Sequence, residues 1–220
     1  MKTRNVWFAA ILAVFCWQSA ISQDHQQSPS EKNPKAVEVI KQALLLENAG
    51  QFEQAIAKYQ EVLKLEPKDF AAMTSIAGLF GKLQMPIEEE AWALKAIAAN
   101  PKYFPAHINY GNGLAMQGKF DSAIKAYREA GRLAPKSPLP IYSQGVVAEN
   151  QDRFEQALAL YKKALEIDPK FEDGLFSAAA MHANLKQFSD AKVLLKKLLD
   201  LNPQAEDARQ MLEAIDRKKP

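Results

Sequence analysis

The chain has 220 residues, and its 28 basic and 26 acidic side chains give a net charge of +2 at neutral pH. Because the two signs are balanced and no basic stretch stands out, the composition argues against nucleic-acid binding. Cysteine occurs once, at Cys16, so the chain cannot form an internal disulfide.

The first 22 residues have the pattern of a secretory signal peptide. Lys2 and Arg4 precede a run of 12 residues without a polar group (6–17), and small residues follow at Ala20 and Ser22. The run is shorter than the about 20 apolar residues of a bilayer-spanning helix. We therefore expect cleavage after Ser22 and an exported protein, periplasmic or secreted. The alternative is an uncleaved N-terminal anchor, which would be the one source of membrane contact.

Cys16 also raises a lipoprotein interpretation. Phe15, however, stands where lipoprotein signals carry a small residue, so lipidation is the weaker alternative. Cleavage after Ser22 would remove Cys16 together with Lys2 and Arg4, which lowers the net charge of the chain from +2 to zero.

Residues 23–35 are polar and contain two prolines, which predicts a flexible tether. Beyond the tether, proline recurs every 34 residues and defines five repeats in which it occupies position 32. These prolines are Pro67, Pro101, Pro135, Pro169 and Pro203. The repeats comprise residues 36–69, 70–103, 104–137, 138–171 and 172–203.

Other positions of the 34-residue frame agree with this division. Position 8 is Ala or Gly in every repeat, position 17 is Phe in four, position 20 is Ala in four, and position 24 is Tyr in three. In repeat three, Ile108, Gly111 and Leu114 recur at helical spacing. Gly118 can adopt the positive φ of a helix end, and Pro135 stops a second helix. Each repeat therefore predicts a helix–turn–helix hairpin.

This pattern resembles the tetratricopeptide repeat (TPR) family over residues 36–203. The resemblance implies an all-α fold, a right-handed superhelical solenoid of five hairpins, because one hairpin cannot bury its apolar stripe alone. Residues 204–220 predict a C-terminal capping helix and tail. The apolar stripe of that helix is Ala208, Met211, Leu212 and Ile215.

Repeat two departs from the frame. Pro86 replaces the phenylalanine of position 17, and three glutamates follow at 88–90. We expect a slightly shifted second helix that carries Trp92 and Leu94 into the core. The alternative is that the three glutamates form a docking patch.

The sequence shows no motif of a catalytic or metal site. HExxH, paired CxxC, GxSxG and a phosphate-binding glycine loop are all missing from it. His25 lies in the tether, while His107 and His182 fall at positions that pack between helices. We therefore expect a protein that is not an enzyme, with no catalytic residue, metal or cofactor.

The TPR resemblance implies that the first helix of each hairpin lines a concave groove. The family's carboxylate clamp needs Lys and Arg at positions 2 and 6, but repeat four has Leu139 and Ser143 and repeat five has Asp173 and Ser177. Capture of a C-terminal carboxylate is therefore not expected. The predicted groove residues are Ile108, Asn109, Asn112, Tyr142, Ser143, Val146, Asn150, Phe176 and Asn184.

These residues suit an extended peptide or a helix of another protein. Asn offers both a donor and an acceptor to a peptide unit, and Tyr142 and Phe176 are expected to be apolar anchors. Alternatively, Asn150 and Asn184 serve only to end helices, and Asn109 and Asn112 are only residues common in the family's consensus. We expect a non-catalytic interaction module or scaffold of the bacterial cell envelope, binding neither nucleic acid nor a small-molecule cofactor. The other hypothesis is a self-assembling or membrane-complex scaffold that uses its convex face or its ends.

Overall fold

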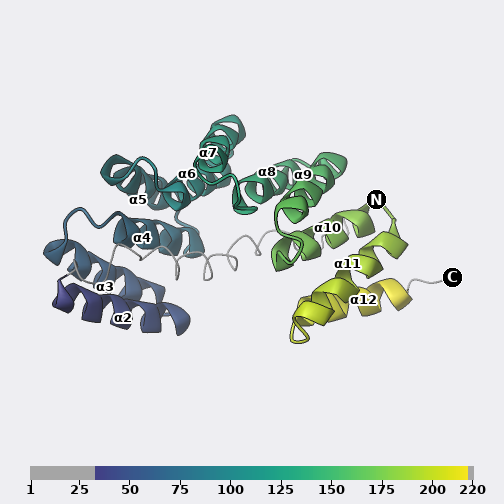
Figure 1. Cartoon of the computed structure of the whole chain (residues 1–220), viewed down its shortest axis with the longest axis horizontal. Coiled ribbons are helices and arrows are strands. Elements are labelled where there is room, and N and C mark those ends of the chain that lie inside the picture. The colour runs from purple at the N-terminus through teal and green to yellow at the C-terminus, as the bar shows by residue number, and fades with distance from the viewer. Residues whose placement is uncertain (1–32, 218–220) are drawn as a thin grey trace, which may run out of the picture. The chain divides into compact units, whose positions relative to one another are not determined.

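The computed structural model describes residues 33–217 (Figure 1). The predicted signal peptide (1–22) and most of the predicted tether (23–35) lie outside the described residues. Within 33–217 the chain forms eleven helices and no strand, which confirms the predicted all-α fold of helical hairpins. The chain divides into two compact units, one ending at Leu133 and the other beginning at Ala134.

Unit 1 consists of three helical hairpins, which match the first three repeats. Its first helices are α2 (Pro34–Asn48), α4 (Phe70–Lys82) and α6 (Phe104–Met116). Its second helices are α3 (Phe52–Leu65), α5 (Pro86–Ala99) and α7 (Phe120–Leu133).

Unit 2 consists of two hairpins and a final helix. The hairpins pair α8 (Leu139–Asn150) with α9 (Phe154–Ile167), and α10 (Glu172–Asn184) with α11 (Phe188–Leu201). The final helix, α12, is Glu206–Arg217. The buried Ala208 and Ile215 of α12 pack with Leu195 and Leu198 of α11, so α12 covers the last hairpin as its apolar stripe predicts.

Every hairpin turns through one residue with a positive φ, at position 15 of the repeat frame. Glycine occupies this position in two repeats, as Gly50 (φ 72°) and Gly118 (φ 75°). The other three turns use Gln84, Asp152 and Lys186, with φ values of 58°, 56° and 61°. Side chains with a Cβ rarely adopt this left-handed region, so these three turns carry local backbone strain.

The second helix of repeat two begins in the same register as the others. α5 starts at Pro86, and α3, α7, α9 and α11 each start at the phenylalanine of position 17. Proline is favourable in the first turn because its missing N–H needs no partner there. The predicted shift of this helix is therefore wrong. Trp92 packs against the core as expected, but Leu94 is 44% exposed, so its predicted burial is also wrong.

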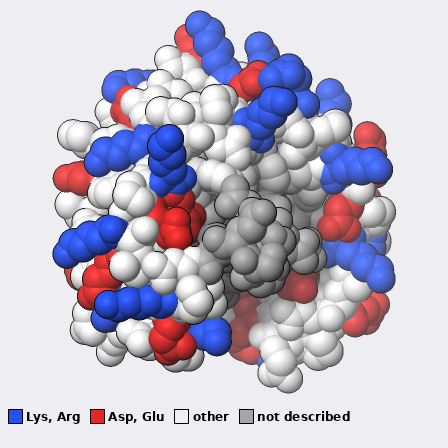
Figure 2. All heavy atoms as spheres, turned by 60° about the vertical axis from the view of Figure 1, so that its left-hand side comes forward, with Lys and Arg blue, Asp and Glu red and all other residues white. Residues whose placement is uncertain are grey.

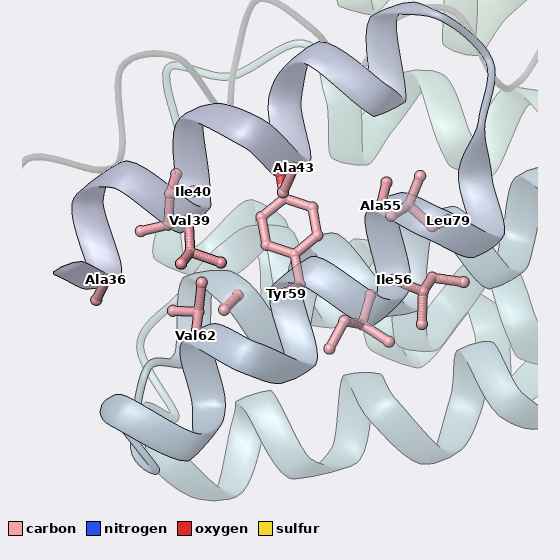
Figure 3. Close-up of a cluster of buried hydrophobic side chains, with 11 residues drawn as sticks. Ala36, Val39, Ile40, Ala43, Ala55, Ile56, Tyr59, Val62 and Leu79 are labelled. Carbon is pink, nitrogen blue, oxygen red and sulfur yellow. The ribbon is translucent and has the colours of Figure 1, made fainter.

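The core of the first hairpin lies between α2 and α3 (Figure 3). The ring of Tyr59 on α3 is directed towards Ala43 of α2, and both side chains are fully buried. Leu79 of α4 joins the same cluster. Burying a side chain of this size stabilises the fold by roughly 1.5–3 kcal/mol.

Glycine at position 8 lets a tyrosine ring pack directly on the first helix. A Cβ added at Gly111 would lie 2.4 Å from Cε1 of Tyr127, and one added at Gly145 would lie 2.6 Å from Cε1 of Tyr161. The small residue at position 8 and the tyrosine at position 24 of the repeat frame therefore pack against each other.

The helices α5 and α6 approach each other at Gly113. A Cβ there would lie 2.9 Å from both the carbonyl oxygen of Pro86 and the backbone nitrogen of Glu90. Gln117 ties the same helices together, because its Nε2 donates to the Glu90 carboxylate at 2.6 Å and to the Gly113 carbonyl at 3.0 Å. This contact positions the divergent repeat two against repeat three.

Candidate protein-binding surface

Four of the five first helices carry much less charge than the second helices, whereas α2 carries four charged side chains, Lys35, Glu38, Lys41 and Glu47. Within α4, α6, α8 and α10 the formally charged side chains are Lys82, Glu149, Glu172 and Asp173. Each second helix, by contrast, carries four or five. Figure 2 shows Lys and Arg interspersed with Asp and Glu over the face that it displays. The four first helices α4, α6, α8 and α10 thus present a surface of amide, hydroxyl and apolar groups.

In unit 1, two of the predicted groove residues are buried, and one of them joins neighbouring helices. Asn109 of α6 donates from its Nδ2 to the carbonyl oxygen of Thr74 on α4 at 3.0 Å, and its exposed fraction is 1%. Ile108 is 5% exposed. Asn112 is half-buried, and its Oδ1 accepts from the hydroxyl of Tyr127 at 2.8 Å. Of these three, Asn112 retains surface for a partner.

In unit 2, Tyr142 is packed into the core. Its ring lies 5.3 Å from that of Tyr161 and 5.1 Å, edge-on, from that of Phe171, and its exposed fraction is 6%. Its hydroxyl lies 3.2 Å from Oγ of Ser177 on α10. Burial raises the pKa of Tyr142 to about 12. Its ring therefore joins α8 to α10, and little of it reaches the surface.

The remaining predicted residues of unit 2 keep surface on two neighbouring first helices. Ser143, Val146 and Phe176 are half-buried, and Asn150 and Asn184 are exposed. We call these five residues the α8–α10 face. Asn150 and Asn184 are the last residues of their helices, which also fits the alternative that they end helices. Contact of this face with a partner stays a prediction.

Two carboxylates belong to the same helices as the α8–α10 face. Asp173 is the residue at position 2 of repeat five, whereas Glu149 is not among the predicted groove residues. Glu149 accepts a hydrogen bond of 2.5 Å from the hydroxyl of Tyr161, and burial raises its pKa. Burial raises the pKa of Asp173, in the first turn of α10, to about 6. In three repeats the tyrosine at position 24 donates its hydroxyl to a first-helix side chain at position 9 or 12 of the same repeat. A polar residue at position 12 of a repeat with this tyrosine is therefore the sequence signal that could have identified Glu149.

Unit 1 contains a buried ion pair that the repeat pattern did not predict. Nζ of Lys82 at the end of α4 lies 2.9 Å from Oε1 of Glu47 on α2, and both side chains are largely buried. The other oxygen of Glu47 lies 3.4 Å from the hydroxyl of Tyr59. Lys82 also lies over the ring of Phe52, with its Nζ 5.3 Å from the ring centre. The cluster joins the first two hairpins and leaves Lys82 little freedom to bind a partner.

The three glutamates of repeat two do not form an exposed patch. Glu89 is 1% exposed, and a Cβ at Gly81 of α4 would lie 2.8 Å from its Oε1. Its Oε2 makes no hydrogen bond within the described residues, and burial raises its pKa well above the ordinary value. Glu90 is bound to Gln117 and lies 3.4 Å from Nζ of Lys119. Only Glu88 remains available, so the docking patch of three glutamates is wrong.

The two described histidines have structural surroundings. Nε2 of His107 lies 2.8 Å from the carbonyl oxygen of Pro101, and Nδ1 of the buried His182 lies 2.6 Å from Oε1 of Gln187. Among residues 33–217, no group of three or more His, Cys, Asp or Glu is placed to hold a metal ion. The helices of that same range are all too short or too polar to cross a membrane.

Known structures share this fold at low sequence identity. A thermophilic TPR protein of Thermus thermophilus superposes with a TM-score of 0.74, is 17% identical and covers 82% of this chain and 98% of its own. PilW, a type IV pilus biogenesis factor, superposes with a TM-score of 0.64 and is 20% identical. The match covers 77% of this chain and 79% of PilW. YrrB, a TPR protein with an unusual peptide-binding site, superposes with a TM-score of 0.51 and is 20% identical. The match covers 89% of this chain and 96% of YrrB. These likenesses establish the fold alone.

A curated relative is the human protein O-mannosyl-transferase TMTC2, which is 30% identical over 95 residues. The match covers 41% of this chain and 11% of that protein, so this chain spans about a tenth of the relative's length.

Family models described as tetratricopeptide repeat match most of the chain. One matches residues 40–103, 89–138 and 111–172, and a second matches residues 150–215. The matches extend through the described hairpins of both units and agree with the 34-residue frame. The chain therefore belongs to the tetratricopeptide repeat family.

Proposed function

We propose that this protein is a non-catalytic interaction module of the bacterial cell envelope, which holds an extended peptide or a helix of a partner protein against the first helices of its hairpins. The observation that carries the proposal is the segregation of charge. The first helices α4, α6, α8 and α10 share four charged side chains, and of these Lys82 and Glu149 are already bound within the protein. The first helix α2 is the exception, with four charged side chains of its own.

The α8–α10 face is the part of this surface best suited to a peptide. Asn150 and Asn184 offer amide donors and acceptors, and Ser143 offers a hydroxyl. Val146 and Phe176 add half-buried apolar surface between these polar groups. Peptide units need both kinds of hydrogen-bonding group, while the apolar side chains supply area that a partner can cover.

Two of the similar structures support this proposal by analogy of fold. YrrB is described as having a peptide-binding site, and PilW as a factor in pilus biogenesis. Binding of proteins or peptides is thus a use to which this fold is put, although a shared fold does not transfer a partner.

Export of the protein is proposed on the N-terminal sequence. Two basic residues, an apolar run and small residues near Ser22 form the pattern that the secretion machinery recognises. Fractionation of cells, with N-terminal sequencing of the recovered protein, tests this. A mature N-terminus at Gln23 in the envelope fraction supports export and cleavage. An intact N-terminus in the cytoplasm would refute it.

The groove is tested by a pair of matched substitutions in unit 2. Ser143→Arg places a long charged side chain in the middle of the α8–α10 face, and Ser189→Arg makes the same change at an exposed position of the second helix α11. Residues 23–220 of each variant are used to isolate partners from envelope extract, and the affinity for the recovered partner is then measured.

We expect Ser143→Arg to weaken partner binding by about tenfold or more, since a buried charge without a counter-ion opposes docking. Ser189→Arg should bind as the unaltered protein does. Circular dichroism verifies that both variants are folded. Equal affinity of the two variants would overturn binding at the α8–α10 face.

A further inference from the structure

The outward surface of α5 differs from that of every other second helix. Its outermost positions are Ile87, Ala91, Leu94 and Ala98, all of them exposed, with exposed fractions of 70% for Ile87 and 44% for Leu94. The equivalent positions of α3, α7, α9 and α11 each include at least two charged side chains. We call these four residues of α5 the α5 stripe. An uncharged stripe of this kind on a solvent-facing helix indicates a surface that another molecule covers.

The spacing of the α5 stripe is that of a helix–helix seam. The residues follow one another at intervals of four, three and four, so they form one line along the 14-residue helix. Alanine alternates with a larger side chain, and alanine permits the close approach of a second helix. The shape of the stripe therefore favours a helix as its occupant.

The alternation of large and small residues makes the stripe complementary to itself. When two copies of α5 pack antiparallel, Ile87 of one lies opposite Ala98 of the other, and Leu94 lies opposite Ala91. Each large side chain then packs against an alanine, and the two-fold axis repeats both contacts in the other half of the pair. A parallel arrangement would instead place large residues together and small residues together, which packs less well.

The charges beside the stripe agree with the same antiparallel arrangement. Glu88 and Lys95 flank the stripe on one side, seven residues apart. Nζ of Lys95 lies 3.7 Å from the centre of the Trp92 ring, a contact that leaves its charge without a carboxylate partner within residues 33–217. In the antiparallel pair, Glu88 of each copy lies near Lys95 of the other. On the opposite flank, Glu90 is bound to Gln117, and Ile97 packs into the core, so that side is already closed.

We propose that α5 is a self-association surface, through which two copies of this chain pair antiparallel about a two-fold axis. The proposal goes beyond the binding of a partner peptide, because it uses the second helix of repeat two and leaves the first helices open. Repeat two departs from the family pattern at Pro86 and Glu89, and the same second helix is the one that carries the apolar outer stripe.

The pair is expected to be weak. A helix of 14 residues is about 21 Å long, and its seam covers a fraction of the roughly 800 Å² per partner that stable dimers bury. The dissociation constant should therefore be on the order of micromolar or weaker. Such an equilibrium responds strongly to local concentration.

Sedimentation equilibrium of residues 23–220, over a wide range of concentration, tests the proposal. The unaltered protein should approach twice the monomer mass at high concentration. Leu94→Glu puts a carboxylate into the seam and should weaken association by about tenfold or more. Leu45→Glu is the matched control, because Leu45 is also an exposed leucine, on α2, and this change should leave association unaltered. A monomer at every concentration, or equal weakening by both variants, would overturn the proposal.

The antiparallel direction is tested by exchanging the flanking charges. Glu88→Lys and Lys95→Glu should each weaken association, since each places like charges opposite one another in both halves of the pair. The double variant restores opposite charges and should regain the association of the unaltered protein. A double variant no better than the single ones would refute the antiparallel pairing. Ser143→Arg should still dimerise, so failure of this proposal and failure of groove binding are distinguishable.

Discussion

Glu89 carries the most unusual chemistry of any single residue described. Position 20 is alanine in the other four repeats, where it allows two helices to pack closely. Here a carboxyl group fills the space beside Gly81 instead. Removing a carboxylate from water without a counter-ion is costly, so the group stays protonated to a higher pH than an exposed one.

Glu89 should therefore make stability depend on pH. Burial raises its pKa in the folded protein well above the ordinary value of 4.5, so the folded state binds more protons than the unfolded state above pH 4.5. Stability should fall as the pH rises from about 4.5 towards the raised pKa, with a limiting slope of about 1.4 kcal/mol per pH unit. Urea unfolding of Glu89→Gln, at a series of pH values, should lack this contribution.

Glu88→Gln is the control for the Glu89 prediction, because Glu88 is half-exposed on the same turn of α5. The raised pKa values of Glu149 and Asp173 act in the same direction, but they are common to all three proteins. The difference between Glu89→Gln and the unaltered chain thus isolates Glu89. Parallel pH profiles for those two proteins would contradict the prediction.

The hydroxyl of Tyr161 should contribute more to the free energy of unfolding than the hydroxyl of Tyr127 does. Tyr161 donates to a carboxylate, Glu149, whereas Tyr127 donates to the neutral amide of Asn112. We expect Tyr161→Phe to cost about 1.5–3 kcal/mol and Tyr127→Phe about 0.5–1.5 kcal/mol of unfolding free energy. Urea unfolding of both variants checks the order. The pKa of Glu149 should also rise in Tyr161→Phe, because that hydrogen bond lowers it.

Among the elements, α5 owes its position to a glycine on its neighbour. Position 10 of the first helix is Leu, Leu, Val or Met in the other repeats, and only repeat three has a glycine there, Gly113. The groups that a new Cβ would meet are backbone atoms of α5, which cannot move without moving the helix. Gly113→Ala should therefore cost about 1–3 kcal/mol. An unchanged thermal midpoint would show that the contact between α5 and α6 is looser than described.

Sequence periodicity predicted the helices well because each repeat supplies independent evidence of the same hairpin. Positions 8, 17, 24 and 32 recur, and chance agreement over five copies is small. The environment of single side chains was harder to predict. Tyr142 falls at a groove position of the frame, yet Tyr161 and Phe171 enclose its ring, and both belong to other parts of the chain. Periodicity along one helix does not report what its neighbours contribute.

At the scale of the whole molecule, the two units should respond separately to a local change. Helices of a repeat protein are stabilised chiefly by the neighbours that they contact. Gly113→Ala lies in unit 1, so it should increase amide hydrogen exchange in α4–α7 more than in α9–α11. Hydrogen exchange followed by mass spectrometry measures both regions together. A uniform increase over residues 33–217 would show that the chain unfolds as one cooperative body.

The sequence predicted that the candidate site lies on the first helices, but it did not predict which side chains there are exposed. The frame predicted which positions line a groove, but it could not separate Asn109, which bonds to the backbone of α4, from Asn112, which keeps exposed surface. The α5 stripe was missed because Leu94 was assigned to the core by its hydrophobic character. Comparison of the same outward position across all five second helices reveals it.

The five hairpin turns offer independent controls on local opening. Each turns through one left-handed residue, and three of these are not glycine: Gln84, Asp152 and Lys186. Glycine at any one of them would relieve strain of roughly 1 kcal/mol, less the entropy that glycine loses on folding. All three lie in connections between helices and belong to neither proposed surface, although each is close to one in sequence. Gln84 is three residues before Ile87 of the α5 stripe, whereas Asp152 and Lys186 are two residues after Asn150 and Asn184 of the α8–α10 face. Substitutions at these turns could therefore change how often a single hairpin opens without altering any residue of the two proposed surfaces. Such variants would show whether a partner binds only after that hairpin has opened.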